Sequence, residues 1–286
     1  MDVGFRLVDA FTETPFRGNR LCVVPETPDD LSVGQMRTLA LEINFSETTF
    51  VTDSRPEGYS MRIFTPDAEL PFAGHPTIGT AFALVAEGRT SSQTVQTTSI
   101  GETPVEVDLE RGFAWMTQRP PAFGAEFADR ELVAAAAALS PDELDHDLPM
   151  QVVSTGLAPL LVPVRDEAAL RRAERIESLV RRATEASGAE CLYLFTVRSA
   201  GDVLARMFDA TFGVGEDPAT GSAAGPLGAY LAAHGLAGLP GAAVISQGEI
   251  VGRPSFLHVD VAPAGRTWTI RVGGGVRIVG EGVFRL

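Results

Sequence analysis

Residues 75–81 read HPTIGTA and residues 217–223 read DPATGSA, and the two stretches align without a gap. Each follows a strand-like segment with a related triplet, RIF at residues 62–64 and RMF at residues 206–208. The matches occur in the same order about half a chain length apart. This self-similarity predicts that the protein consists of two similar halves.

A third match supports the repeat, because Glu47 opens the run ETTFV and Glu190 opens the run ECLYL upstream of the other two. The strand pattern pauses at residues 119–121 (RPP), before an alanine-rich helical pattern, so the boundary is expected there. The predicted halves are residues 1–118, with residues 275–286 as a candidate strand to complete them, and residues 119–274.

Short β-rich runs alternate with helical patterns along the whole chain, and strands outnumber helices. The order is not a regular βαβ repeat, so a mixed-sheet α+β fold is predicted rather than a doubly wound one. The glycine run at residues 273–275 lacks the context of a dinucleotide fingerprint and predicts a tight turn before the last strand. Helices are expected at residues 32–41, 76–87, 127–139, 166–187 and 218–234.

The composition is that of a globular protein, with 286 residues, 45% hydrophobic and 21% charged. No run of 18 apolar residues and no leader pattern occur, so a soluble, unexported protein is expected. Cys22 and Cys191 lie in apolar runs, which predicts buried thiols in a reducing cytoplasm rather than a disulfide or metal pair. The net charge of −14 repels phosphate backbones and anionic lipids, so nucleic-acid and membrane partners are not expected.

In each repeat a polar residue is followed by proline at the start of a helical pattern. Asp217 and Pro218 fit an N-cap and first helical position well, and His75 before its proline fits less well. Both helices are apolar on nearly every side, which is typical of a helix enclosed by sheet. If a pseudo-twofold axis relates the halves, two helix N-termini face one cleft and can bind a carboxylate. The candidate substrate-binding residues are Gly74, Thr220, Gly221 and Ser222.

Three motifs in order carry a family resemblance: SETTFV at residues 46–51, FAGHPT at 72–77 and GEDPATGSA at 215–223. Together they resemble the signature of the phenazine-biosynthesis F-like (PhzF-like) proteins, which share the diaminopimelate epimerase fold. Further matches, from VDAF at residues 8–11 to GRPS at 252–255, extend the resemblance over essentially the whole chain. The resemblance implies an α+β fold of two pseudo-symmetric domains, each a mixed β-sheet or barrel wrapped around a central helix.

The resemblance also implies an active site between the domains, a small-molecule substrate, no metal, no organic cofactor and commonly a homodimer. By motif matching, Glu47 is the proton donor and acceptor. His75 and Asp217 assist it as further catalytic residues, and Ser222 lines the same cleft. The implied activity is a cofactor-independent isomerisation or epimerisation of a carboxylate-bearing metabolite.

Two features depart from the family pattern. After Gly18 and Asn19 the family usually has proline, whereas this chain has Arg20. Related racemases and epimerases use a cysteine at each helix start, but the corresponding positions here are 74–75 (GH) and 216–217 (ED). The residue types therefore exclude a two-thiol racemase mechanism.

Simpler interpretations of the same residues remain open at this stage. Glu47 alone is also consistent with a solvated carboxylate at a strand start, since most glutamates are exposed. His75 and Asp217 are also consistent with capping roles, and Ser222 with packing in the first helical turn. The alternative functions are a lyase or hydrolase on the same site, or a non-catalytic small-molecule-binding protein. The motifs do not name a substrate.

Overall fold

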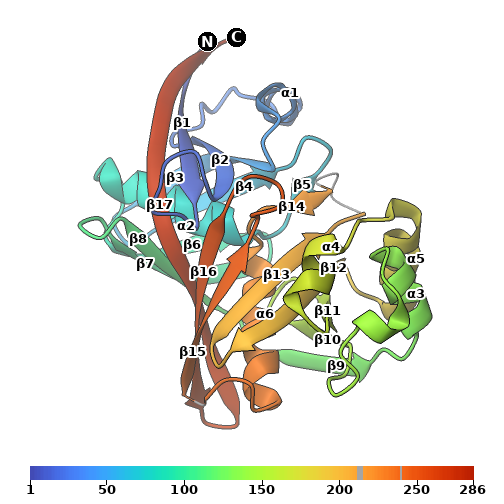
Figure 1. Cartoon of the computed structure of the whole chain (residues 1–286). Coiled ribbons are helices and arrows are strands. Elements are labelled where there is room, and N and C mark those ends of the chain that lie inside the picture. The colour runs from blue at the N-terminus through green and yellow to red at the C-terminus, as the bar shows by residue number, and fades with distance from the viewer. Residues whose placement is uncertain (211–214, 239) are drawn as a thin grey trace. The chain divides into compact units, whose positions relative to one another are not determined.

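The computed structural model describes residues 1–210, 215–238 and 240–286, and the chain divides into two compact units. Unit 1 comprises Met1–Thr117 together with Gly273–Leu286, and unit 2 comprises Gln118–Val272. The long last strand β17 (Thr267–Arg285) begins in unit 2 and ends in unit 1. The two chain termini lie side by side in unit 1, where the Met1 amino group donates to the Leu286 carbonyl at 2.6 Å (Figure 1).

Unit 1 is a closed barrel of eight strands. The pairing runs β17, β1, β2, β3, β4, β6, β7 and β8, and β8 pairs with β17 again. Two pairs, β2 with β3 and β4 with β6, are parallel. The strands are β1 (Asp2–Ala10), β2 (Asn19–Val24), β3 (Glu47–Arg55), β4 (Gly58–Phe64), β6 (Gln93–Thr98), β7 (Gly101–Asp108) and β8 (Phe113–Gln118).

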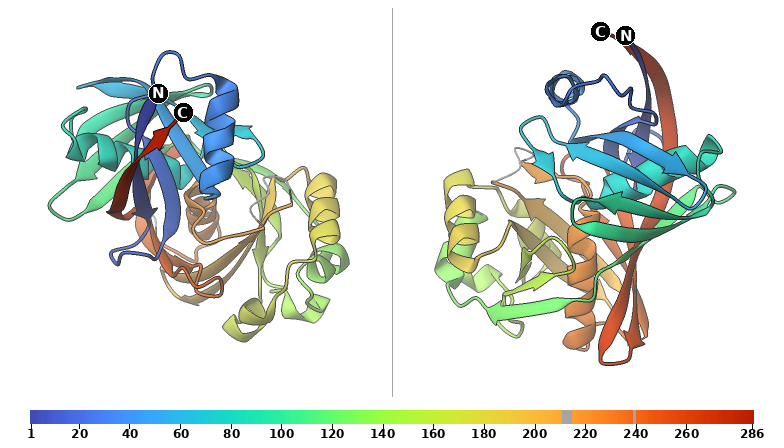
Figure 2. Two further views of the ribbon diagram at one scale, coloured as in Figure 1. Left: turned by 90° about the horizontal axis from the view of Figure 1, so that it is seen from above. Right: turned by 180° about the vertical axis from the view of Figure 1, so that it is seen from behind.

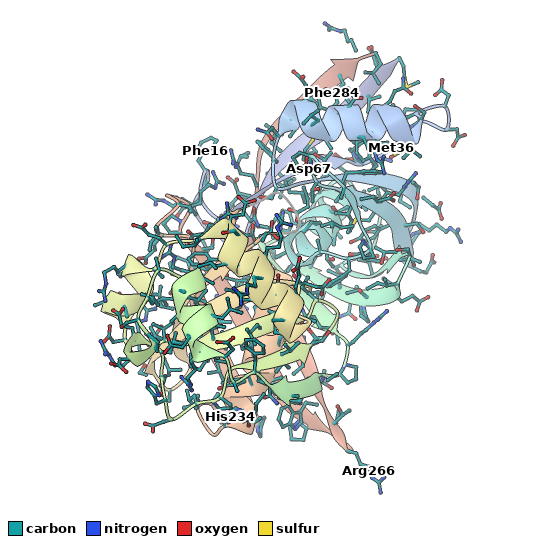
Figure 3. The ribbon with its side chains drawn as sticks, turned by 90° about the vertical axis from the view of Figure 1, so that its right-hand side faces the viewer. Phe16, Met36, Asp67, His234, Arg266 and Phe284 are labelled. Carbon is teal, nitrogen blue, oxygen red and sulfur yellow. The ribbon has the colours of Figure 1, made fainter. Side chains whose placement is uncertain are left out.

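Helix α2 (Gly74–Ala86) packs against strands of this barrel and is buried continuously from Gly74 to Leu84. A helix apolar on every side cannot be stable on a protein surface, so its sequence requires this enclosure. Helix α1 (Val33–Ile43) covers the barrel from outside, and its N-cap Ser32 forms a capping box with Gln35. Met36 of α1 packs in the same apolar cluster as Phe284 of β17 (Figure 3).

Unit 2 repeats the same order of elements. β9, β10, β11, β12, β13, β15 and β16 pair in turn, and β11 with β12 and β13 with β15 are again the parallel pairs. Helix α6 (Gly221–Ala233), buried from Gly221 to Leu231, lies against these strands (Figure 2). The strands are β9 (Ala122–Glu126), β10 (Gln151–Ser154), β11 (Pro159–Pro163), β12 (Cys191–Ser199), β13 (Asp202–Phe208), β15 (Gly241–Gln247) and β16 (Ser255–Ala264).

A second layer of helices covers one side of unit 2. A core cluster of aliphatic residues, including Val133 and Val180, joins these helices to β11 and β12. The helices are α3 (Arg130–Ala136), the 3₁₀ turn η1 (Pro141–Glu143), α4 (Glu167–Arg172) and α5 (Glu177–Ser187). The predicted α+β class, with mixed sheets around a central helix in each half, is confirmed.

The repeated Arg-x-Phe triplets hold two short strands, β5 (Glu69–Leu70) and β14 (Glu216–Asp217), which precede the central helices. Arg62 donates two hydrogen bonds to the Glu69 carboxylate, both at 2.7 Å. Arg206 does the same to Glu216 at 2.9 and 2.7 Å. Each guanidinium also lies over the phenylalanine two residues on, at 4.8–5.2 Å from the ring centroid. In each unit the arginine of the triplet therefore holds the short strand that leads into the central helix.

The prediction of one continuous helix over residues 166–187 is wrong, because the segment forms two helices, α4 and α5, separated by a non-helical stretch. The buried Arg206 donates to carbonyls at the end of α4, including that of Leu170 at 3.0 Å, in place of a following helical turn. The connecting segment also bonds to the end of α3, from Glu174 N–H to the Ala137 carbonyl at 2.9 Å. Tertiary partners therefore overrule the continuous helical pattern.

The predicted turn at residues 273–275 is also wrong, because β17 runs straight through it. A Cβ at Gly273 would lie 2.6 Å from the Trp115 ring, and one at Gly275 would lie 2.5 Å from the Thr12 carbonyl oxygen. These glycines therefore allow neighbouring backbone and an aromatic ring to approach a strand closely.

Candidate active site

Glu47 is the first residue of β3, and His75 lies in the first turn of α2. Both are buried, with relative exposures of 8% and 3%. Their Oε2 and Nε2 atoms are 3.0 Å apart, but without the alignment of a hydrogen bond. Within the described residues Glu47 Oε2 accepts no hydrogen bond, so a buried acceptor position stays available to a ligand.

Asn19, the fully buried first residue of β2, orients the histidine. Ser46 Oγ donates to Asn19 Oδ1 at 3.1 Å, and Asn19 Nδ2 lies 3.1 Å from His75 Nδ1. With Oδ1 accepting from the serine, the amide NH₂ donates to Nδ1, and a neutral imidazole carries its proton on Nε2, next to Glu47. The sequence reasoning missed this role, although Gly18 and Asn19 were part of the family pattern.

Asp217 belongs to unit 2, where it ends the short strand β14 and is buried. Its Oδ2 accepts a 2.6 Å hydrogen bond from Thr220 Oγ1. The interpretation of Asp217 as a helix N-cap is wrong, because α6 begins at Gly221 with Thr220 as N-cap. Pairing of Asp217 with Met207 keeps the strand going to that point, so Pro218 lies outside the helix.

His75 is not an N-cap either, since α2 begins at Gly74 after Ala73. Neither central helix has a side-chain capping hydrogen bond at its N-terminus. Gly74 is therefore the first residue of an uncapped helix in unit 1, and Gly221 and Ser222 are the first two of another in unit 2. Such N-termini attract anions, which is the chemistry expected of these residues.

The predicted site residues thus form two groups, one in each unit. Glu47, His75 and Gly74 come together in unit 1. In unit 2, Thr220 and Asp217 are in contact, and Gly221 and Ser222 follow directly in α6. Two partners that were not predicted, Asn19 and Gln247, connect to these groups.

A family model described as "Phenazine biosynthesis-like protein" matches residues 8–284. The chain belongs to this family. A trans-2,3-dihydro-3-hydroxyanthranilate isomerase of Pseudomonas chlororaphis is 37% identical over 256 residues, which cover 88% of this chain and 87% of that relative. A solved PhzF-family phenazine biosynthesis protein of Bacillus anthracis is 27% identical, with a TM-score of 0.89 and full coverage of both chains. A structure described as a predicted epimerase from Pseudomonas aeruginosa is 34% identical, with a TM-score of 0.86 and 99% coverage of each.

Membership in this PhzF family confirms the resemblance read from the three motifs. The named relatives are isomerases, so the prediction of an enzyme of this class is confirmed. Among the helices described, none combines the length and apolar composition that a membrane crossing requires. Within residues 1–210, 215–238 and 240–286 no three histidine, cysteine or acidic side chains cluster as metal ligands would.

Proposed function

We propose that this member of the PhzF family is a cofactor-independent isomerase or epimerase of a small carboxylate-bearing metabolite, with Glu47 as the proton-transferring group. One observation carries the proposal: a buried carboxylate oxygen of Glu47 that accepts no hydrogen bond within the described residues lies 3.0 Å from His75 Nε2. A structural carboxylate at this depth would be expected to have donors.

In the proposed reaction the substrate's carboxylate binds at the helix N-termini, to which Gly74, Gly221 and Ser222 belong. Glu47 removes a proton from an activated carbon. The same residue, or His75 or Asp217, returns a proton to another carbon or to the opposite face. The net result is a double-bond shift or an epimerisation. The wider proposal includes two domains dividing after residue 118, an interdomain site, a homodimer and a cytoplasmic location, and these rest on the family resemblance and the composition.

The named relative supplies a first probe, trans-2,3-dihydro-3-hydroxyanthranilate. Substrate-dependent incorporation of solvent deuterium, measured by NMR, reports proton exchange at carbon whether the product is an isomer or an epimer. Glu47→Gln keeps the side-chain shape and removes the base, so the exchange rate should fall by about 10²- to 10⁴-fold.

The matched control is Glu190→Gln, at the corresponding position of the repeat. Glu190 Oε2 accepts from the Ala158 backbone N–H at 2.7 Å, so this carboxylate has a structural partner. The control variant should retain exchange. Undiminished exchange in Glu47→Gln would remove Glu47 from the role, and binding without exchange in the wild type would favour the non-catalytic alternative.

A further inference from the structure

Gln247, the last residue of β15, is a fully buried amide with four hydrogen bonds. Its Oε1 accepts from the Tyr193 hydroxyl at 2.8 Å and from the Thr220 backbone N–H at 3.3 Å. Its Nε2 donates to the Asp217 carbonyl at 2.8 Å and to Thr220 Oγ1 at 3.0 Å. All the hydrogen-bonding atoms of this amide face the segment that leads into α6.

Backbone groups fix the direction of every bond in this cluster. A backbone N–H can only donate and a carbonyl can only accept, so the two ends of the Gln247 amide cannot be exchanged. Tyr193 must then donate its hydroxyl proton to Oε1. Thr220 Oγ1 accepts from Nε2, so the single proton of this hydroxyl points to Asp217 Oδ2, 2.6 Å away. The hydrogen bonds therefore follow one direction, with Tyr193 donating to Gln247, Gln247 to Thr220, and Thr220 to the Asp217 carboxylate.

We propose that Tyr193, Gln247 and Thr220 are positioning residues that hold Asp217 as an ionised carboxylate beside the start of α6. A carboxylate oxygen that receives a short, directed hydrogen bond favours the charged form of the group. The inference rests on the proposed function where it gives Asp217 a part in the reaction. Asp217 then enters the cycle without a proton and can return one to the substrate only after it has accepted one in the same cycle. Thr220, whose hydroxyl and N–H are both bonded within the protein, acts through Asp217.

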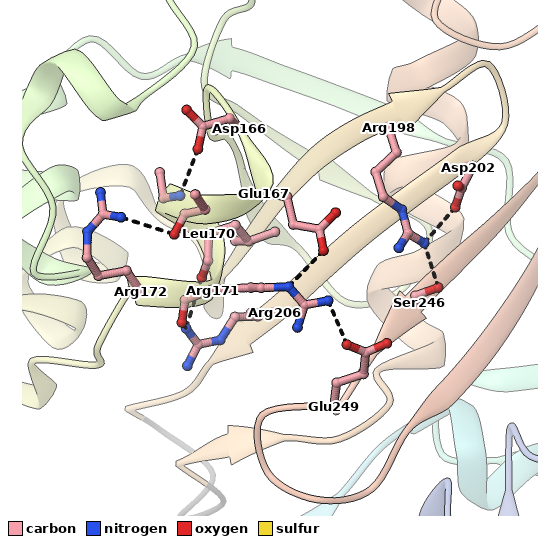
Figure 4. Close-up of polar contacts among 12 residues, drawn as sticks. Asp166, Glu167, Leu170, Arg171, Arg172, Arg198, Asp202, Arg206, Ser246 and Glu249 are labelled. Carbon is pink, nitrogen blue, oxygen red and sulfur yellow. Dashed lines mark hydrogen bonds and ion pairs between the residues drawn. The ribbon is translucent and has the colours of Figure 1, made fainter.

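Two arginines hold the strand end that carries Gln247. On one side Arg198 donates to Ser246 Oγ at 2.9 Å, and on the other Arg171 donates to Glu249 at 2.7 Å (Figure 4). These contacts tie Ser246, directly before Gln247, to β12, and Glu249, two residues after it, to α4. The backbone that carries the amide is therefore held by contacts that do not involve Asp217.

Among the described residues, the titratable groups near Asp217 include Tyr193, Cys191 and the adjacent Glu216. Burial, and then the charge of Asp217, raises the pKa of Tyr193 well above its usual range. The pKa of Cys191 is raised by burial first, and then by the charges of Asp209, Glu190 and Asp217. Both groups are neutral near pH 7. The adjacent Glu216 is paired with Arg206 at 2.7 Å.

The test measures the ionisation of Asp217 directly in the full-length protein, without substrate. Aspartate labelled with ¹³C at Cγ is incorporated, and Asp217→Asn identifies the resonance to be followed through a pH titration. Thr220→Val keeps the side-chain shape and removes the donor, so the Asp217 midpoint should rise by about one pH unit. Thr220→Ser keeps the hydroxyl and should restore the wild-type midpoint.

An Asp217 midpoint that is the same in Thr220→Val and wild type would overturn the proposal. If Thr220→Val does not fold, Gln247→Met provides the test. It removes the hydrogen bond that precedes Thr220 in the series and should also raise the Asp217 titration midpoint. A role in packing alone would lower stability without moving the titration. The measurement needs no turnover, so its failure is distinct from a failure of Glu47→Gln to slow exchange.

Discussion

Replacing Gly225 with alanine tests how closely α6 packs in unit 2. An added Cβ would overlap Gln118 Oε1 and lie 2.8 Å from Gln118 Cδ. The Gln118 amide is buried and both of its polar atoms are bonded, because Oε1 accepts from Thr155 Oγ1 at 2.6 Å and Nε2 donates to the Gly221 carbonyl at 2.8 Å. Displacing it would break both bonds and leave buried partners unsatisfied.

Breaking a buried hydrogen bond so that its partner is left unsatisfied costs about 1–3 kcal/mol, so the two bonds together are worth about 2–6 kcal/mol. The higher helix propensity of alanine offsets about 1 kcal/mol of this. The expected net loss in the free energy of unfolding is about 1–5 kcal/mol, which lowers Tm by about 2 °C per kcal/mol in a chain of this size. Circular dichroism during thermal and urea unfolding measures the change.

Gly34 in α1 supplies the matched control, since its added Cβ would meet only Ser32 Oγ at 3.9 Å. Gly34→Ala should be neutral or stabilising by up to about 1 kcal/mol. In a Gln118→Ala background the overlap with Gln118 is absent and the 3.1 Å approach to Ile270 Cγ2 remains, so Gly225→Ala should cost less there than in the wild type. An equal cost in both backgrounds, or a stabilised single variant, would refute the packing argument.

Two further predictions concern buried groups. Burial raises the pKa of Cys22 to about 12 and that of Cys191 well above its usual value, so a thiol reagent at pH 8 should label neither cysteine until urea exposes both. Above pH 9 the unfolded thiols lose protons that the folded ones keep, so stability should fall as pH rises, by about 1.4 kcal/mol per pH unit for each thiol; a flat alkaline profile would contradict the raised values. Arg206→Lys should cost about 3 kcal/mol in urea unfolding, because lysine cannot replace the paired bonds to Glu216 and the bonds to α4 carbonyls, whereas Arg62→Lys, in a pair about one-third exposed, should cost less than about 1 kcal/mol. Equal costs would show that burial does not separate the two pairs.

The sequence predicted those features that local pattern determines. The duplicated motif fixed the repeat of elements, and the apolar helices at residues 76–87 and 218–234 were found within a few residues of α2 and α6. The local rule failed at Asp217, where an aspartate before proline predicts a cap. Strand pairing with Met207 overruled it. A capping preference is small beside a strand ladder, so such errors are expected where a strand runs directly into a helix.

The hydrogen-bond partners of the site residues could not be predicted from the sequence for a different reason. Tyr193 and Gln247 are 54 positions apart, and neither belongs to a motif that specifies the other. A buried amide acquires its role only when the fold brings donors and acceptors to it. The glycine run in β17 shows the same limit, because the Trp115 ring and the Thr12 carbonyl that require it come from strand β8 and from the loop after β1.

The repeat itself explains why only one of two equivalent glutamates is proposed to react. Glu47 starts β3, and Glu190 directly precedes β12, the corresponding strand of unit 2. Glu190 is tied to the backbone N–H of Ala158, which directly precedes β11. In unit 1 the first residue of β2 is Asn19, whose amide contacts His75. The Glu190 carboxylate therefore links the chain segments just before β11 and β12. Oε2 of Glu47 accepts no hydrogen bond from the described residues and lies 3.0 Å from Nε2 of the oriented His75. Duplicated folds can thus keep the same backbone position in both halves and use it for structure in one and for chemistry in the other.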